Sequence, residues 1–203
     1  MLPRALPLLA VGLLLAACAA APDDPFWYHS DPHLRQIDTS IGALSFDDEA
    51  GWGTTSDQLV LGLEWAEQFD LPFLLQGGIH YSRDRDQEPD LFGQLVDVER
   101  DLWTFSFGAL LAPWRDTSRV SPYLGGGGAV GRADVRSDED TFDSHDWTTG
   151  GYFKLGLDLH LYPGGHAGLQ YRVFRGSDLD LNGLSVSPDY EALLVVFGTS
   201  FGG

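Results

Sequence analysis

His80 and Ser82 have the residue types that nucleophilic catalysis needs, because a histidine can take the proton of a serine hydroxyl. They lie two residues apart in a segment of alternating polarity, so they belong to the same face of a strand. Neighbours on one strand face are about 7 Å apart at Cα, which is longer than the reach of a general base. The alternative is that both are polar residues inside a β-structure or at its rim.

A second candidate site is the run from Asp178 to Gly183, which is followed by Asp189. Its oxygen ligands match positions 1, 3, 5 and 12 of an EF-hand calcium loop, and a glycine occupies position 6. The ligands are Asp178, Asp180, Asn182 and Asp189. An aspartate replaces the usual bidentate glutamate, and strand-like residues replace the flanking helices. The pattern predicts either a weak calcium site or an acidic, turn-forming external loop.

Cys18 is the single cysteine, and it ends an apolar N-terminal segment with one cation, Arg4. A single cysteine excludes a disulfide framework and a zinc site built mainly on thiolates. Residues 1–17 have the charged start and the apolar run of a secretory signal peptide. The run is too short to span a bilayer as a helix, which takes about 20 residues.

The residues Leu15-Ala16-Ala17-Cys18 resemble the lipobox of bacterial lipoproteins. The resemblance implies cleavage before Cys18 and a lipid on its sulfur. Because alanine rather than aspartate follows the cysteine, it also implies the outer membrane. We therefore expect a signal peptide at 1–17 and a lipidated tether at 18–36. The alternative is ordinary cleavage after the small residues 19–21.

The charge of the chain argues against several partners. The 203 residues include 30 Asp and Glu against 12 Lys and Arg, a formal net charge of −18. A chain this acidic lacks the basic footprint that nucleic acid requires, so no nucleic-acid partner is expected. The same charge argues against adsorption to anionic membrane surfaces through basic patches. Its 25 glycines and 12% aromatic residues favour β-structure over a helical bundle.

From residue 37 onward the polarity alternates with the period of a β-strand. In one segment Leu59, Leu61, Leu63 and Trp65 share a face, while Glu64 lies on the other face. Eight such segments are present, at about 37–46, 59–66, 73–82, 103–111, 121–133, 153–161, 169–174 and 192–201. The alternation does not assign the faces of the first and the fifth.

The connections between these segments alternate in character. Long, acidic connections alternate with shorter ones that form turns. The long ones are 47–57, 83–98, 134–148 and 178–188, and the short ones are 68–71, 112–120 and 163–166. This asymmetry is typical of transmembrane β-barrels, whose strands need roughly 9–11 residues to span. We therefore predict an all-β fold over residues 37–201, an eight-stranded antiparallel up-and-down transmembrane β-barrel.

Two segments resemble the small eight-stranded outer-membrane barrels of the OmpA/OmpX type: Ser121-Pro122-Tyr123-Leu124 with the glycines after it, and the apolar end up to Phe201. This resemblance implies a non-enzymatic barrel in the bacterial outer membrane, with a structural or surface-contact role among outer-membrane lipids. Lipid A deacylase barrels offer a different resemblance, through His80 and Ser82, and imply an acyl-ester hydrolase. Arg83 stands where that family has asparagine.

A further alternative is a soluble, lipid-anchored barrel whose apolar face points inward and binds a small apolar ligand. Three observations favour the membrane barrel instead. The apolar faces carry more large side chains than an eight-stranded barrel can enclose. The opposite faces are rich in glycine and alanine. Aromatic residues gather near strand ends, as in the interfacial girdles of membrane barrels.

Acidic runs at 47–49, 84–90 and 138–140 are expected to be solvated loop faces. Lipopolysaccharide, held through divalent ions, is the partner that these runs could contact. Beyond calcium, we expect no cofactor.

An ion pair is expected inside the barrel. If residues 163–166 close a hairpin through a three-residue loop with a glycine at positive φ, Asp158 lies opposite Arg172 and His160 lies opposite Gln170. Loss of one partner of such a buried pair would cost about 3–5 kcal/mol.

The lipobox predicts that Cys18 is acylated. A Cys18→Ser variant should lose the mass of the lipid, because no other cysteine in the chain can accept it. Intact mass spectrometry of the membrane fraction measures this. An unmodified N-terminus downstream of Cys18 in the wild-type protein would contradict the prediction.

Overall fold

The computed structural model describes residues 35–46, 57–70, 72–89, 95–113, 119–137, 143–162, 164–181 and 183–201. The predicted signal peptide, Cys18 and most of the predicted tether lie outside these residues. Within them, no helix is long and apolar enough to cross a membrane.

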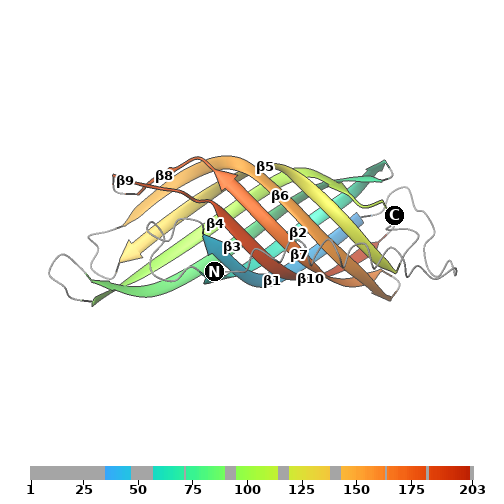
Figure 1. The fold of residues 1–203 in the computed structure, drawn as a ribbon, viewed down its shortest axis with the longest axis horizontal. Helices are drawn as coiled ribbons and strands as arrows, with labels where there is room; N and C mark the ends of the chain where they lie inside the picture. The colour runs from blue at the N-terminus through green and yellow to red at the C-terminus, as the bar shows by residue number, and fades with distance from the viewer. Residues whose placement is uncertain are drawn as a thin grey trace, which may run out of the picture.

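The described residues form ten strands, eight of which close an antiparallel barrel in the order β1-β10-β7-β6-β5-β4-β3-β2 (Figure 1). The barrel strands are β1 (Arg35–Phe46), β2 (Asp57–Asp70), β3 (Phe73–Pro89), β4 (Leu95–Leu111), β5 (Val120–Ser137), β6 (Ser144–Tyr162), β7 (Gly165–Gly176) and β10 (Tyr190–Phe201). A separate hairpin consists of β8 (Leu179–Leu181) and β9 (Leu184–Val186). Consecutive barrel strands are neighbours and β1 pairs with β10, which confirms the predicted eight-stranded up-and-down barrel.

The two ends of the barrel differ. At the turn end, β2 meets β3 and β6 meets β7 through tight turns, and Gly164 takes the positive φ of 82° that the second turn requires. At the loop end, β3 and β4 continue to Pro89 and Leu95, and β5 and β6 to Ser137 and Ser144. The prediction that 83–98 and 134–148 are loops is therefore largely wrong.

These strands extend because their alternation persists beyond the apolar region. Outward positions there carry Arg83, Arg85, Glu99 and Asp101, which pair across strands instead of facing lipid. Cross-strand pairs of opposite charge stabilise a sheet that has left the membrane.

The large apolar residues point outward. Leu59, Leu61, Leu63 and Trp65 are 59%, 46%, 52% and 46% exposed, whereas Glu64 between them is buried. Exposed leucine, phenylalanine and tryptophan recur around the barrel on the other strands. A soluble barrel would enclose this face, so the soluble alternative is wrong. The same parity assigns both segments that alternation left open: Ser40 and Leu44 point inward on β1, and Tyr123 and Ala129 on β5.

The lumen is filled in layers. Near the loop end lies an apolar cluster that includes Leu44, Phe46, Phe174 and Tyr190, which we call the outer cluster. The hairpin β8–β9 lies at this end of the barrel (Figure 1), and its Leu179, Leu181 and Val186 pack into the outer cluster. A smaller inner cluster lies near the turn end and comprises Ala66, Leu74, Leu110, Ala112 and Tyr123. Polar side chains occupy the space between the clusters.

The register of β6 and β7 differs from the prediction. Asp158 lies opposite Gly168, His160 opposite His166, and Lys154 opposite Arg172. The turn is tighter than the expected three-residue loop, with Tyr162 paired to Gly165 after a bulge. Both strands keep their faces, because an even shift preserves the alternation. The predicted Asp158–Arg172 pair is therefore wrong, although Arg172 does point into the lumen.

An added methyl group should have very different effects at two glycines on neighbouring strands. A Cβ at Gly108 would collide with the backbone carbonyl of Gly126, whereas a Cβ at Gly128 meets nothing within 4 Å. We expect Gly108→Ala to cost about 1–3 kcal/mol of unfolding free energy. Gly128→Ala should change it by less than about 0.5 kcal/mol. Urea unfolding of both variants in lipid vesicles measures the difference, and equal losses would contradict this packing.

Candidate functional site

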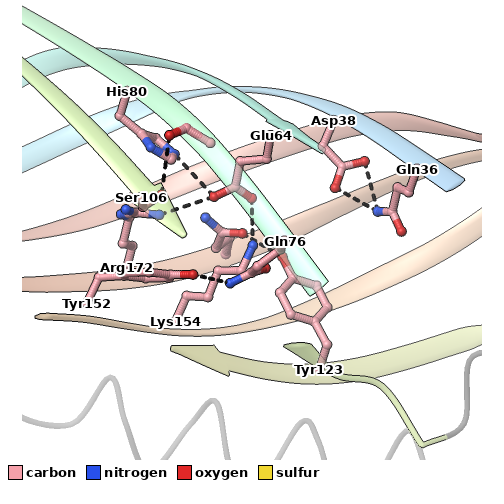
Figure 2. Close-up of polar contacts among 12 residues, drawn as sticks. Gln36, Asp38, Glu64, Gln76, His80, Ser106, Tyr123, Tyr152, Lys154 and Arg172 are labelled. Atoms are coloured by element: carbon pink, nitrogen blue, oxygen red, sulfur yellow. Dashed lines mark hydrogen bonds and ion pairs between the residues drawn. The ribbon is translucent and has the colours of Figure 1, made fainter. Parts of the chain in front are cut away.

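Glu64 is the centre of a buried ionic cluster in the middle of the lumen (Figure 2). Lys154 Nζ donates to its Oε2 at 2.6 Å, and Arg172 Nη1 donates to its Oε1 at 3.1 Å. His80 Nε2 lies 3.4 Å from the same Oε1. All four residues are at most 6% exposed. They come from β2, β3, β6 and β7, so the cluster ties together strands that do not all adjoin.

Two aromatic rings lie against the cations of this cluster. One carboxylate cannot balance two fixed cations, and an uncompensated buried charge is costly. The Arg172 guanidinium lies 4.4 Å from the ring centroid of Tyr152, and Lys154 Nζ lies 5.6 Å from that of Tyr123. Ring faces attract cations within about 6 Å. The ring faces of Tyr152 and Tyr123 therefore stabilise the two buried cations by electrostatic attraction.

The tyrosine hydroxyls extend the polar layer. Tyr123 donates to Gln170 Oε1 at 3.0 Å, and Gln76 Nε2 donates to the Tyr152 hydroxyl at 2.5 Å. Each ring thus contacts a cation with its face and an amide with its edge, which holds both rings across the lumen (Figure 2).

A second polar group lies nearer the turn end, on β1 and β7. His166 Nε2 lies 2.9 Å from Asp38 Oδ1, and Gln36 Nε2 donates to Asp38 Oδ2 at 2.6 Å. His166 is 4% exposed. A Cβ on Gly198 would collide with both Asp38 and His166, so the glycine makes the room for this contact.

His80 and Ser82 both point into the lumen, 3% and 1% exposed. His80 lies beside Glu64, and Ser82 Oγ has no hydrogen-bond partner within the described part of the chain. Ser82 lies opposite Val60 and Leu102, two members of the outer cluster. The structure therefore does not bring the pair into the hydrogen bond of a catalytic dyad, and it encloses the serine under apolar side chains.

The predicted calcium loop contains the hairpin β8–β9. Asp180 Oδ1 accepts from the backbone N–H of Gly183, and Asp189 Oδ1 accepts from that of Gly176. Asp178 Oδ2 accepts from Ser185 Oγ at 3.4 Å, and Asn182 lies outside the described residues. Among the residues that the structure describes, no group of three or more histidine, cysteine or acidic side chains could hold a metal ion. The calcium site stays a prediction.

Asp146 anchors this hairpin to β6 at the loop end. Its Oδ2 accepts the Asp180 N–H at 2.7 Å, and its Oδ1 accepts the Trp147 N–H at 2.8 Å. These two backbone donors, Asp180 first, lower the pKa of the Asp146 carboxyl. Asp146 and the apolar side chains of the hairpin thus attach it to the barrel.

Sequence reasoning missed Glu64 and Lys154. The signal was available, because each is a charged residue on the inward face of a strand whose outward neighbours are large and apolar. A charge in that position needs a partner across the lumen.

Comparison with known proteins gives a family and a fold. The family model described as outer membrane protein beta-barrel domain matches residues 8–191. No curated protein matches the chain.

Similar solved structures include Neisserial surface protein A, at 17% identity and a TM-score of 0.58, over 84% of this chain and 97% of that one. The outer membrane protein OprG from Pseudomonas aeruginosa has 17% identity and a TM-score of 0.59, over 85% of this chain and 98% of that one. Ail of Yersinia pestis, in complex with the heparin analogue sucrose octasulfate, has 17% identity and a TM-score of 0.54, over 83% of this chain and 97% of that one. At these identities the likeness shows the fold alone.

The ionic cluster predicts non-additive losses of stability. Glu64→Gln leaves two buried cations without a carboxylate and should cost about 3–5 kcal/mol of unfolding free energy. Arg172→Met leaves the Glu64–Lys154 pair intact and should cost less. The double variant Glu64→Gln/Arg172→Met should lose less unfolding free energy than the two single variants lose together, as measured by urea unfolding in lipid vesicles. Asp158→Asn combined with Arg172→Met is the control, and these losses should add to within about 0.5 kcal/mol. Coupling between Asp158 and Arg172 would contradict the observed register.

Proposed function

The chain belongs to the outer membrane protein beta-barrel domain family and lies in the bacterial outer membrane. We propose that it acts there as a non-enzymatic barrel with a structural or surface-contact role. We also propose that a lipid on Cys18 anchors it to that membrane. The packed lumen is the observation that carries this proposal. Eight strands leave an interior just wide enough for side chains. Here the outer cluster, the Glu64 cluster and the inner cluster occupy it in turn. The surfaces that remain for function are the outward face and the loop end.

The lipid anchor is supported by the lipobox and by the place where the barrel begins. Arg35, the first residue of β1, lies at the turn end. Short turns face the periplasm in barrels of this kind. A lipid on Cys18 would then enter the inner leaflet of the outer membrane, within reach of the tether.

The orientation predicts which residues can be labelled on intact cells. Ser185→Cys on β9 should react with a membrane-impermeant maleimide on whole cells, because it is exposed at the loop end. Arg119→Cys, exposed at the turn end, should react only after the outer membrane is permeabilised. The wild-type protein is the control for Cys18, whose sulfur is blocked if it is acylated. Labelling of Arg119→Cys alone on intact cells would invert the topology.

The hydrolase alternative has a direct test. Expression of the wild-type protein should leave the acyl content of lipid A unchanged, as measured by mass spectrometry of extracted lipid A. Ser82→Ala should give the same spectrum. Loss of an acyl chain with the wild-type protein, but not with Ser82→Ala, would overturn the non-enzymatic proposal.

A further inference from the structure

Four arginines share the outward face of the strand extensions at the loop end: Arg83 and Arg85 on β3, and Arg132 and Arg136 on β5. We call them the arginine row. The whole chain has 12 Lys and Arg against 30 Asp and Glu, so a third of its cations lie on this one face. Glu99, Asp101 and Asp134 lie on the same face, so the arginines are interspersed with carboxylates.

The arginine row begins at an aromatic girdle. Arg132 lies directly opposite Trp103 and Trp147, and its guanidinium carbon is 5.7 Å from the Trp147 ring centroid. Arg83 follows Tyr81, whose ring centroid is 4.4 Å from that of Trp103. Tryptophan and tyrosine in this arrangement mark the boundary between hydrocarbon and headgroups.

The distances along the strands place the row at the level of lipid headgroups. A strand rises about 3.3 Å per residue, and a tilt of about 40° leaves roughly 5 Å of height for two residues. Arg83 therefore lies about 5 Å beyond Tyr81, and Arg85 about 10 Å. The headgroup layer is about 5–7 Å thick on each side of the bilayer. Arg132 and Arg83 lie within it, whereas Arg85 and Arg136 lie a few Å beyond it, above the headgroups.

Neighbouring carboxylates orient the guanidinium groups without covering them. Glu99 pairs with Arg83 and, at 3.2 Å, with Arg85. Asp134 Oδ1 pairs with Arg132 at 2.9 Å. Even so, the four arginine side chains remain 50%, 67%, 41% and 61% exposed, in chain order. A guanidinium has five N–H donors, so donors are left for a phosphate that approaches from the membrane side.

We propose that the arginine row binds the phosphate groups of a phosphorylated glycolipid of the lipid A class in the outer leaflet. The inference rests on the proposed orientation, with the loop end outside. Guanidinium groups bind phosphate in a bidentate manner, and the girdle brings the glycolipid's acyl chains against Trp103 and Trp147. The acidic runs that the sequence suggested for divalent-mediated contact are a separate route to the same lipid.

The test is binding of bisphosphorylated lipid A to the purified full chain in phospholipid nanodiscs. Removal of two arginines, in Arg83→Gln/Arg132→Gln, should weaken binding at least about tenfold, because each removes a charge-assisted contact. Lipid A without its phosphates should bind the wild-type protein as weakly as the double variant binds the intact lipid. Arg83→Lys/Arg132→Lys should fall between, since the charge stays but the fork is lost.

Arg35→Gln is the matched control. Arg35 is an exposed arginine in an outward ion pair, 3.1 Å from Glu67, but it lies at the opposite end of the barrel. It should bind lipid A like the wild-type protein. Heat-modifiable migration on gels checks that each variant is folded.

Several outcomes would overturn the proposal: equal binding by the wild-type protein and the double glutamine variant, equal loss in Arg35→Gln, or equal binding of dephosphorylated lipid A. Complete loss of binding in EDTA would assign the contact to divalent ions at the acidic runs instead. Binding of sucrose octasulfate without binding of lipid A would indicate a soluble anionic sugar. Labelling on whole cells tests the orientation separately, so failure of that premise is distinguishable from failure of the site.

Discussion

The structure depends on the hydrogen bonds between β1 and β10, which pair Arg35–Phe46 with Tyr190–Phe201 along their whole lengths. Inside a membrane no water is present to satisfy backbone N–H and C=O groups, so a sheet survives there only if it has no free edge. Once the sheet is closed, every strand has one face toward lipid and one toward the lumen. The outward leucines and phenylalanines and the crowded interior both follow from that closure.

Crowding inside the closed sheet explains the pairing of large polar side chains with glycine. A Cβ at Gly62 would meet His80 and Ser40, one at Gly78 would lie 2.8 Å from the Glu64 side chain, and one at Gly156 would collide with the Tyr123 ring. The Glu64 cluster therefore needs small residues on the strands around it as much as it needs its own charges. Packing and electrostatics are inseparable here, since ions this deeply buried are stable only at contact distance.

The sequence was sufficient for those features that alternation controls. It predicts eight strands and groups Leu59 with Leu63 on one face, because a period of two sorts residues into faces without knowledge of partners. That this face points outward follows from its excess of large side chains, which an eight-stranded barrel cannot enclose. The sequence failed where the partner matters. The predicted Asp158–Arg172 pair is wrong because the turn at 163–166 is tighter than a three-residue loop. Alternation cannot detect this error, since an even shift along the strand leaves every face unchanged. The strand extensions are not predictable from alternation, because outward residues such as Arg85 and Glu99 are as polar as loop residues and only their pairing across strands shows the sheet. Cations with a common face, such as Arg83 and Arg132, are far apart in the sequence, and only the barrel brings their strands into one sheet.

The hairpin β8–β9 can pack at the loop end of the barrel only after the first and last strands have paired. Leu179 and Leu181 pack in a cluster that draws Leu44 and Phe46 from the first strand and Tyr190 and Leu194 from the last. This cluster crosses the seam between the two ends of the sheet, so the hairpin has no complete binding surface until the seam has formed. Its burial is therefore a late step of assembly, and protection of the hairpin from solvent would mark the moment at which a nascent chain becomes a finished barrel.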